Sequence, residues 1–127
     1  MATTVPSTVP ARRRLGTVAL WTVQIALAAA FAGGGLVKLA GDPVMVDLFD
    51  RVGAGQWLRY LVGALELAAA VGLLVPRLAK FAAAGLVLLM VGAAVTNVAI
   101  IDESPLMPLA YLVVAGIVAW RRHVRDR

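Results

Sequence analysis

Two long segments without a charged residue constrain most strongly what this chain can fold into. They are Leu15–Val37, with 23 residues, and Phe81–Ile101, with 21 residues. A helix rises by about 1.5 Å per residue, so roughly 20 apolar residues cross the hydrocarbon core of a bilayer. The 127 residues are 61% hydrophobic and only 15% charged, whereas soluble domains are about 45–50% apolar and 25% charged. We therefore expect an integral membrane protein.

Two further apolar runs complete the expected architecture, an all-α bundle of four transmembrane helices. One run is Trp57–Val75, which Pro76 ends, and the other follows the acidic turn at residues 102–105. The expected spans cover about residues 15–40, 57–75, 79–101 and 106–120, within one membrane domain of residues 15–120. Residues 1–14 are expected to be a disordered basic tail, and residues 121–127 a basic C-terminal tail.

A short amphipathic helix is predicted between the first and second spans, at residues 43–52. Its apolar residues share one helical face, which suits a helix lying at the membrane surface. Asp42 is a suitable N-cap, and Pro43 suits the first helical position. Glycines at positions 53 and 55 are expected to end it.

The net charge of +5 is distributed as membrane topology requires. Nine of the twelve Lys and Arg residues lie in clusters at residues 12–14, 77–80 and 121–127. Because positive loops stay in the cytoplasm, we expect a bacterial-type plasma membrane protein with both termini cytoplasmic, and no nucleic-acid partner. The chain has no cysteine and one histidine, so no metal site is expected.

Small residues recur at four-residue steps in the hydrophobic segments, as in Ala26-Ala30-Gly34 and Ala64-Ala68-Gly72. Such stripes permit close helix contact in membranes. We interpret them as helix-packing faces. The Gly33–Gly35 triplet is further expected to allow a kink or the close approach of a ligand.

Glu66 is the tenth residue of the 19-residue run that begins at Trp57, near the middle of the membrane. An ionised carboxylate there costs roughly 2.5–3.5 kcal/mol unless it is protonated or paired. Lys38 and Arg59 are the candidate partners. Thr96 and Asn97 are expected at an intermediate depth in the outer half, and Tyr60 and Tyr111 add hydroxyl groups on that side.

The predicted ligand-binding residues are therefore Lys38, Arg59, Tyr60, Glu66, Thr96 and Asn97. Three interpretations of this group stay open. It is a buried ion pair that orients the helices, a polar floor for a bound molecule, or a catalytic site in which Glu66 is the general acid or base.

Several of these residues lie in elements that resemble the DoxX-like family over roughly residues 15–120. They are Phe31-Ala-Gly-Gly-Gly-Leu-Val-Lys38-Leu-Ala-Gly41, Trp57-Leu-Arg-Tyr60, Gly63-Ala-Leu-Glu66-Leu and Met90-Val-Gly-Ala-Ala-Val-Thr96-Asn97. The resemblance implies a small four-helix membrane protein with both termini inside. It also singles out Lys38 and Glu66 as the two polar residues that belong to the family's sequence elements. Relatives often have a histidine at the position of Asn97, so a proton relay or metal role that needs an imidazole is not expected here.

The family takes its name from a subunit associated with thiosulfate:quinone oxidoreduction, and other relatives are linked to oxidative-stress complexes or receptor assembly. The resemblance thus implies an accessory subunit that binds a quinone or a lipid and partners a membrane or cytoplasmic oxidoreductase. A quinone is the one candidate cofactor, and a homo-oligomer is a candidate assembly. The alternatives are an intramembrane enzyme that uses Glu66 on an isoprenoid-like substrate, and a structural scaffold or assembly factor.

Overall fold

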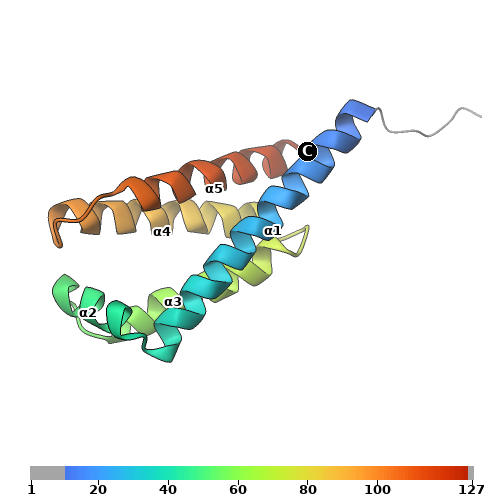
Figure 1. Cartoon of the computed structure of the whole chain (residues 1–127). Coiled ribbons are helices and arrows are strands. Elements are labelled where there is room, and N and C mark those ends of the chain that lie inside the picture. The colour runs from blue at the N-terminus through green and yellow to red at the C-terminus, as the bar shows by residue number, and fades with distance from the viewer. Residues whose placement is uncertain (1–10, 126–127) are drawn as a thin grey trace, which may run out of the picture.

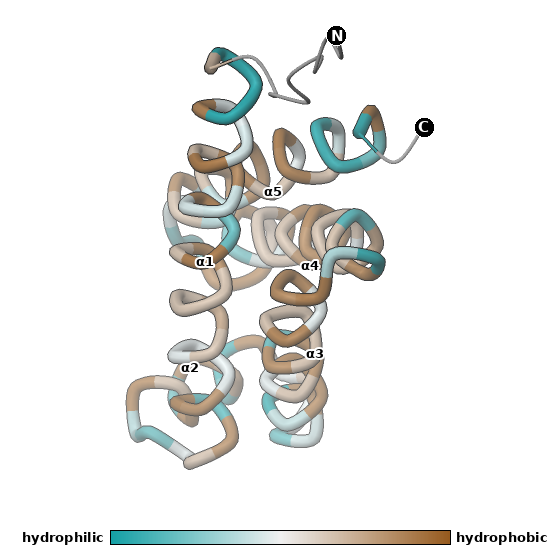
Figure 2. The backbone as a smooth tube through the Cα atoms, turned by 90° about the vertical axis from the view of Figure 1, so that its right-hand side faces the viewer, coloured by the Kyte–Doolittle hydropathy of each residue, from teal (hydrophilic) through white to brown (hydrophobic). Residues whose placement is uncertain are grey.

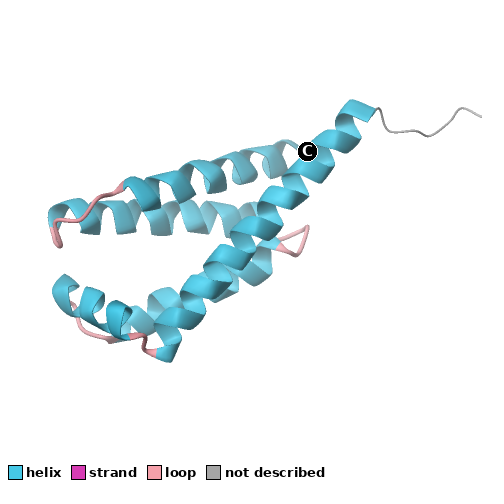
Figure 3. Ribbon diagram, in the orientation of Figure 1, coloured by secondary structure: helices cyan, strands magenta, loops and turns pink. Residues whose placement is uncertain are grey.

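The computed structural model describes residues 11–125, which form five helices and no strand (Figure 1, Figure 3). The helices are α1 (Ala11–Ala40), α2 (Pro43–Val52), α3 (Trp57–Leu73), α4 (Ala79–Ala99) and α5 (Leu106–Arg125). The expectation of an all-α chain is confirmed. The observed bounds follow the four expected hydrophobic helices and the short helix between the first two.

Both ends of α2 have the local chemistry that the sequence predicts. The Asp42 carboxylate accepts a hydrogen bond from the backbone N–H of Val44 at 3.1 Å, and Pro43 occupies the first turn. Gly53 ends the helix in the left-handed conformation with φ 84°, which costs glycine little because it has no Cβ. The amphipathic helix at residues 43–52 is therefore confirmed.

The four long helices form two closely packed pairs, α1 with α3 and α4 with α5. The α3–α4 turn joins the pairs, and α3 packs on α4 while α1 packs on α5. Figure 1 shows the pairs closest at the end with the α3–α4 turn and diverging toward the end that carries α2. This divergence leaves space between the pairs on the α2 side.

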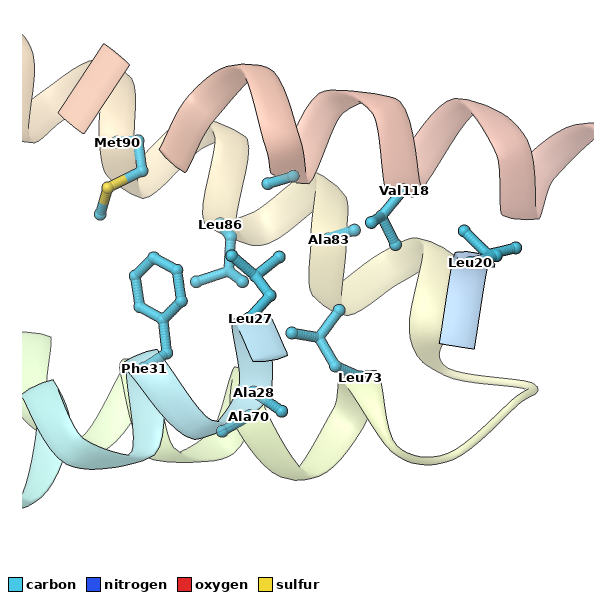
Figure 4. Packing of buried hydrophobic residues seen from close by; sticks show 11 residues of the cluster. Leu20, Leu27, Ala28, Phe31, Ala70, Leu73, Ala83, Leu86, Met90 and Val118 are labelled. Atoms are coloured by element: carbon cyan, nitrogen blue, oxygen red, sulfur yellow. The ribbon is translucent and has the colours of Figure 1, made fainter. Parts of the chain in front are cut away.

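A hydrophobic core fills the region where the pairs meet (Figure 4). Leu73, Leu86 and Val118 are fully buried there, and Leu27 and Phe31 of α1 point into the same region. A single cluster therefore joins all four long helices. Its buried members are Leu20, Leu27, Ala28, Phe31, Ala70, Leu73, Ala83, Leu86, Met90, Ala115 and Val118.

The contact faces differ from most of the predicted small-residue stripes. Ala26 and Ala30 are exposed, as are Ala64 and Ala68. The buried face of α1 instead contains Gln24, Leu27, Ala28, Phe31 and Gly35. The prediction failed for these four alanines, although Gly34 and Gly72 of the same stripes do make close contacts with other helices. Small residues occur on nearly every face of these helices, so their spacing alone does not select one. On α3 the buried face contains Arg59, Gly63, Glu66 and Ala70, as expected for residues that share one helical face.

Two of the described helices, α1 and α4, are long and apolar enough to cross a membrane. Large apolar side chains also cover the outside of the bundle; Leu88 of α4 is 74% exposed and Val113 of α5 is 57% exposed. Such extensive exposure is unfavourable in water, where contiguous apolar patches mark membrane or protein contacts. Figure 2 shows that hydrophilic residues lie mostly toward the ends of the helices.

The described parts of the three basic segments lie toward one end of the molecule, opposite α2 (Figure 1). Gln24 of α1 donates to the Leu73 carbonyl at 2.8 Å and accepts from Arg122 of α5 at 2.6 Å. These bonds tie the middle of α1, the end of α3 and the last turns of α5 together. Residues 12–14 and 121–125 are helical, so the helices extend into segments that the sequence assigned to tails. Residues 1–10 and 126–127 lie outside the described part.

Candidate functional site

A pocket of about 570 Å³ lies between the two helix pairs at their α2 end. Its walls come from all five helices, with Phe49 of α2, Val62 of α3 and Met90 of α4 among the apolar lining residues. Lys38, Glu66, Thr96 and Asn97 also line it. Four of the six predicted ligand-binding residues thus share one pocket.

The Glu66 carboxylate is paired with the Lys38 ammonium. Oε1 of Glu66 lies 2.8 Å from Nζ of Lys38, and the two side chains are 5% and 17% exposed. A buried charge is tolerated when a partner of opposite charge compensates for its desolvation. The expected partnership of Lys38 with Glu66 is therefore present, and it joins α1 to α3 at the pocket wall.

Glycines on α1 make room for this pair and for the adjoining helix. A Cβ on Gly34 would lie 2.8 Å from Oε2 of Glu66, and one on Gly35 would lie 2.7 Å from the Gly63 carbonyl oxygen. Real Cβ atoms do not approach so closely, so a side chain at Gly35 would push the α3 backbone away, whereas one at Gly34 would displace the Glu66 carboxylate. Gly34 and Gly35 thus make room for Glu66 and for the α3 backbone, and α1 continues as one helix to Ala40 without the expected kink.

Arg59 is buried, at 5% exposure, yet its recorded bonds lead away from Glu66. Its Nε donates to the Gln56 side chain at 2.7 Å, and its Nη1 donates to the backbone carbonyl of Lys38. Its guanidinium also lies 4.3 Å from the centre of the Tyr60 ring. Arg59 therefore supports the end of α1 that carries Lys38, and does not take the predicted place in the ion pair.

Thr96 and Asn97 line the pocket, and each has a local hydrogen bond. The Thr96 hydroxyl donates to the Gly92 carbonyl at 2.8 Å, and the Asn97 amide donates to the Ser104 carbonyl at 2.8 Å. Tyr60 is 51% exposed and does not line the pocket. Tyr111 does line it, with its ring edge-on to Phe31 at a centroid distance of 5.1 Å.

An ion pair at the α2 end joins α2 to the connection between α4 and α5. Nη2 of Arg51 lies 2.8 Å from Oε1 of Glu103 and donates to the Ile101 carbonyl at 3.0 Å. Arg51 belongs to α2, whereas Ile101 and Glu103 belong to the connection between α4 and α5. The hydrogen bond to Glu103 raises the pKa of Arg51 above its ordinary value. Both side chains are accessible, at 42% and 51% exposure, so this contact is open to exchange with water.

Sequence reasoning missed two features of the molecule. The sequence predicted that the helix at residues 43–52 lies at the membrane surface, and gave it no part in a binding site. In the structure this helix, α2, forms a wall of the pocket through Met45, Leu48, Phe49 and Val52. The sequence also indicated no role for Gln24, although Gln24 is completely buried and bonds to Leu73 and Arg122. The apolar stripe of residues 43–52 carried a signal for the first feature. No local signal pairs Gln24 with Arg122, which lies 98 residues later.

No group of three His, Asp or Glu side chains that could hold a metal ion occurs within residues 11–125. The sequence model of the DoxX-like family matches residues 22–119. The chain belongs to the DoxX-like family. The matched range includes Lys38, Glu66, Thr96 and Asn97, so these four pocket residues of this DoxX-like protein lie inside the family region. Family membership and the long apolar helices support a membrane protein. No curated protein and no solved structure matches the chain.

Proposed function

We propose that this DoxX-like protein is an accessory membrane subunit that binds a hydrophobic molecule with a polar head, a quinone or a lipid, in the pocket at its α2 end. The observation that carries the proposal is the pocket itself. Its volume of about 570 Å³ lies within the roughly 300–1,000 Å³ of small-molecule sites, which are mostly apolar with a few placed polar groups. The Lys38–Glu66 pair supplies such groups.

The chemistry of the lining suits an amphiphile better than a fully polar ligand. Phe49, Val62 and Met90 offer apolar surface to a tail or ring. An ammonium group has three N–H donors, so Lys38 can bond to a ligand carbonyl while it remains paired with Glu66. A quinone carbonyl or a lipid ester oxygen is the matching acceptor.

The same proposal places the pocket in the outer half of a plasma membrane. In it, α1, α3, α4 and α5 span the bilayer, α2 lies at the outer surface, and both termini are cytoplasmic. The basic end opposite α2 supports this orientation through the retention of positive charge in the cytoplasm. The partnership with an oxidoreductase rests on the resemblance alone.

Val62→Phe tests the binding proposal, because Val62 is half-buried and lines the pocket. Solvent extracts of the purified protein are analysed by mass spectrometry, and thermal stabilisation by a short-tailed ubiquinone and by phosphatidylglycerol is measured. We expect a bound amphiphile in the unchanged protein and about tenfold weaker binding in the variant, a loss of about 1.4 kcal/mol. Val71→Phe is the matched control, since Val71 lies on the same helix, is 65% exposed and does not line the pocket.

Equal binding by the Val62 and Val71 variants, or no ligand in any of them, would overturn the proposal. Glu66→Gln separates binding from catalysis by Glu66. A folded variant that keeps its ligand and accumulates no other compound supports an accessory subunit. A folded variant that retains ligand and accumulates an unconverted isoprenoid-like compound, absent from the unchanged protein, identifies an enzyme and contradicts the proposal.

A further inference from the structure

The end of the molecule opposite the pocket has a large excess of positive charge. No Asp or Glu occurs in residues 1–41, 67–101 or 104–125, and Asp126 is the one acidic residue near this end in the sequence. Intramolecular ion pairs therefore cannot neutralise most of the charge. The basic residues of this end within the described part of the chain are Arg12, Arg13, Arg14, Arg77, Lys80, Arg121, Arg122 and Arg125.

Two of these guanidinium groups converge on one point beside α1. Nη2 of Arg125 lies 3.3 Å, and Nη2 of Arg121 lies 3.9 Å, from the position that a Cβ on Gly16 would occupy. Gly16 thus leaves a notch on α1, and two arginines that are four residues apart on α5 reach into it. Like charges at this spacing repel each other on a helix, so the arrangement favours an anion bound between them.

Neighbouring bonds hold the notch in place. Nη1 of Arg125 donates to the Thr17 hydroxyl at 2.7 Å, and that hydroxyl donates to the Arg13 carbonyl at 3.0 Å. Arg122 points inward to Gln24, which secures the last turns of α5 against α1. The remaining N–H groups of Arg121 and Arg125 provide planar donor pairs of the kind that bind phosphate in a bidentate manner.

The surroundings place this notch at the level of lipid head groups. Trp120 directly precedes Arg121, its ring is 62% exposed, and the Arg121 guanidinium lies 5.9 Å from the ring centre. Exposed tryptophans concentrate at the membrane–water interface, where basic pockets between helices bind anionic phospholipids. We propose that the Gly16 notch, with Arg121 and Arg125, is a binding site for the phosphate group of an anionic phospholipid.

A charge-matched pair of double variants tests this site. Arg121→Gln/Arg125→Gln removes two positive charges at the notch, and Arg77→Gln/Lys80→Gln removes two from the same end elsewhere. Binding of phosphatidylglycerol and of phosphatidylcholine to the full-length protein in detergent is titrated by native mass spectrometry. We expect the notch variant to bind phosphatidylglycerol about thirtyfold more weakly, and the control variant to change by less than about threefold. Phosphatidylcholine binding should be weak in all three proteins.

A third variant, Gly16→Leu, blocks the notch without changing the charge, and should weaken phosphatidylglycerol binding by a similar factor if the charge variant fails to fold. Equal losses in the two double variants would show diffuse attraction to the basic end and overturn the proposal. So would equal affinity for the two lipids, or equal thermal stabilisation of the unchanged protein by inorganic phosphate alone, which would identify a soluble anion as the ligand.

Discussion

At the scale of single residues, the central question is how a carboxylate is accommodated in the middle of an apolar helix. The structure answers it with one contact, the 2.8 Å ion pair between Glu66 and Lys38. Arg59, which shares a helical face with Glu66, bonds instead to Gln56 and to the Lys38 backbone. The pair lines the pocket, so the same two groups stabilise the helix contact and are available to a ligand.

Removal of one member of this pair should destabilise the protein more than removal of both. Lys38→Met leaves an uncompensated buried carboxylate, and we expect it to lower the free energy of unfolding by about 3–5 kcal/mol. The double variant Lys38→Met/Glu66→Leu replaces the pair with apolar groups and should recover most of this loss. Unfolding by sodium dodecyl sulfate in mixed micelles measures both.

The accessible pair of Arg51 and Glu103 provides the control, because exposed ion pairs contribute only about 0–1 kcal/mol. Arg51→Met should therefore change the free energy of unfolding by less than about 1 kcal/mol. Losses from Lys38→Met and Glu66→Leu that simply add in the double variant would show that the two groups do not interact.

At the scale of helices, the contact between α1 and α3 depends on the absence of side chains. Gly35 of α1 and Gly63 of α3 face each other, and a Cβ on Gly63 would lie 3.1 Å from the Gly35 carbonyl oxygen. In a membrane the helices gain little from water exclusion, so close packing of small residues contributes much of their affinity. This approach also brings Lys38 within reach of Glu66.

The glycine triplet permits a test with an internal control. Gly35→Ala would place a Cβ 2.7 Å from a backbone oxygen, and we expect it to destabilise the protein by about 1–3 kcal/mol, as overpacking does. Gly33→Ala meets nothing within 4 Å and should stabilise the helix by up to roughly 1 kcal/mol. Thermal unfolding in detergent compares them; equal effects at the two positions would contradict the proposed contact.

At the scale of the whole molecule, the basic segments share one end and α2 lies at the other. Residues 76 and 104 flank α4, so they lie on opposite sides of a membrane that α4 crosses. Ala54, in the connection between α2 and α3, should share a side with Ser104 if α3 also crosses. The native chain has no cysteine, which makes each position testable by a single introduced thiol.

We expect Ala54→Cys and Ser104→Cys to react with a membrane-impermeant maleimide in intact cells, and Pro76→Cys to react only after permeabilisation. The physical reason is the retention of the basic end in the cytoplasm. The reverse pattern would invert the proposed orientation. Labelling of all three positions from one side would exclude a four-span topology.

The sequence by itself determined the helices and the ends of the short amphipathic one. Charge-free runs long enough for a bilayer, and Asp42, Pro43 and Gly53 at the boundaries of α2, are local signals whose physical effect does not depend on distant residues. They also placed Lys38 and Glu66 in helices at depths from which they could meet. Family resemblance separately marked the same two residues.

Only the tertiary structure decided which faces meet and which polar groups pair. Small residues on several faces of each helix offered more than one packing arrangement, and the rotation of a helix about its axis determines whether Arg59 or Lys38 reaches Glu66. The same rotation brought Arg122 to Gln24, and Arg121 and Arg125 to Gly16. These contacts depend on how each helix is rotated about its axis and on which distant segments pack together. The hydrophobicity pattern of a single helix determines neither the rotation nor the packing partner.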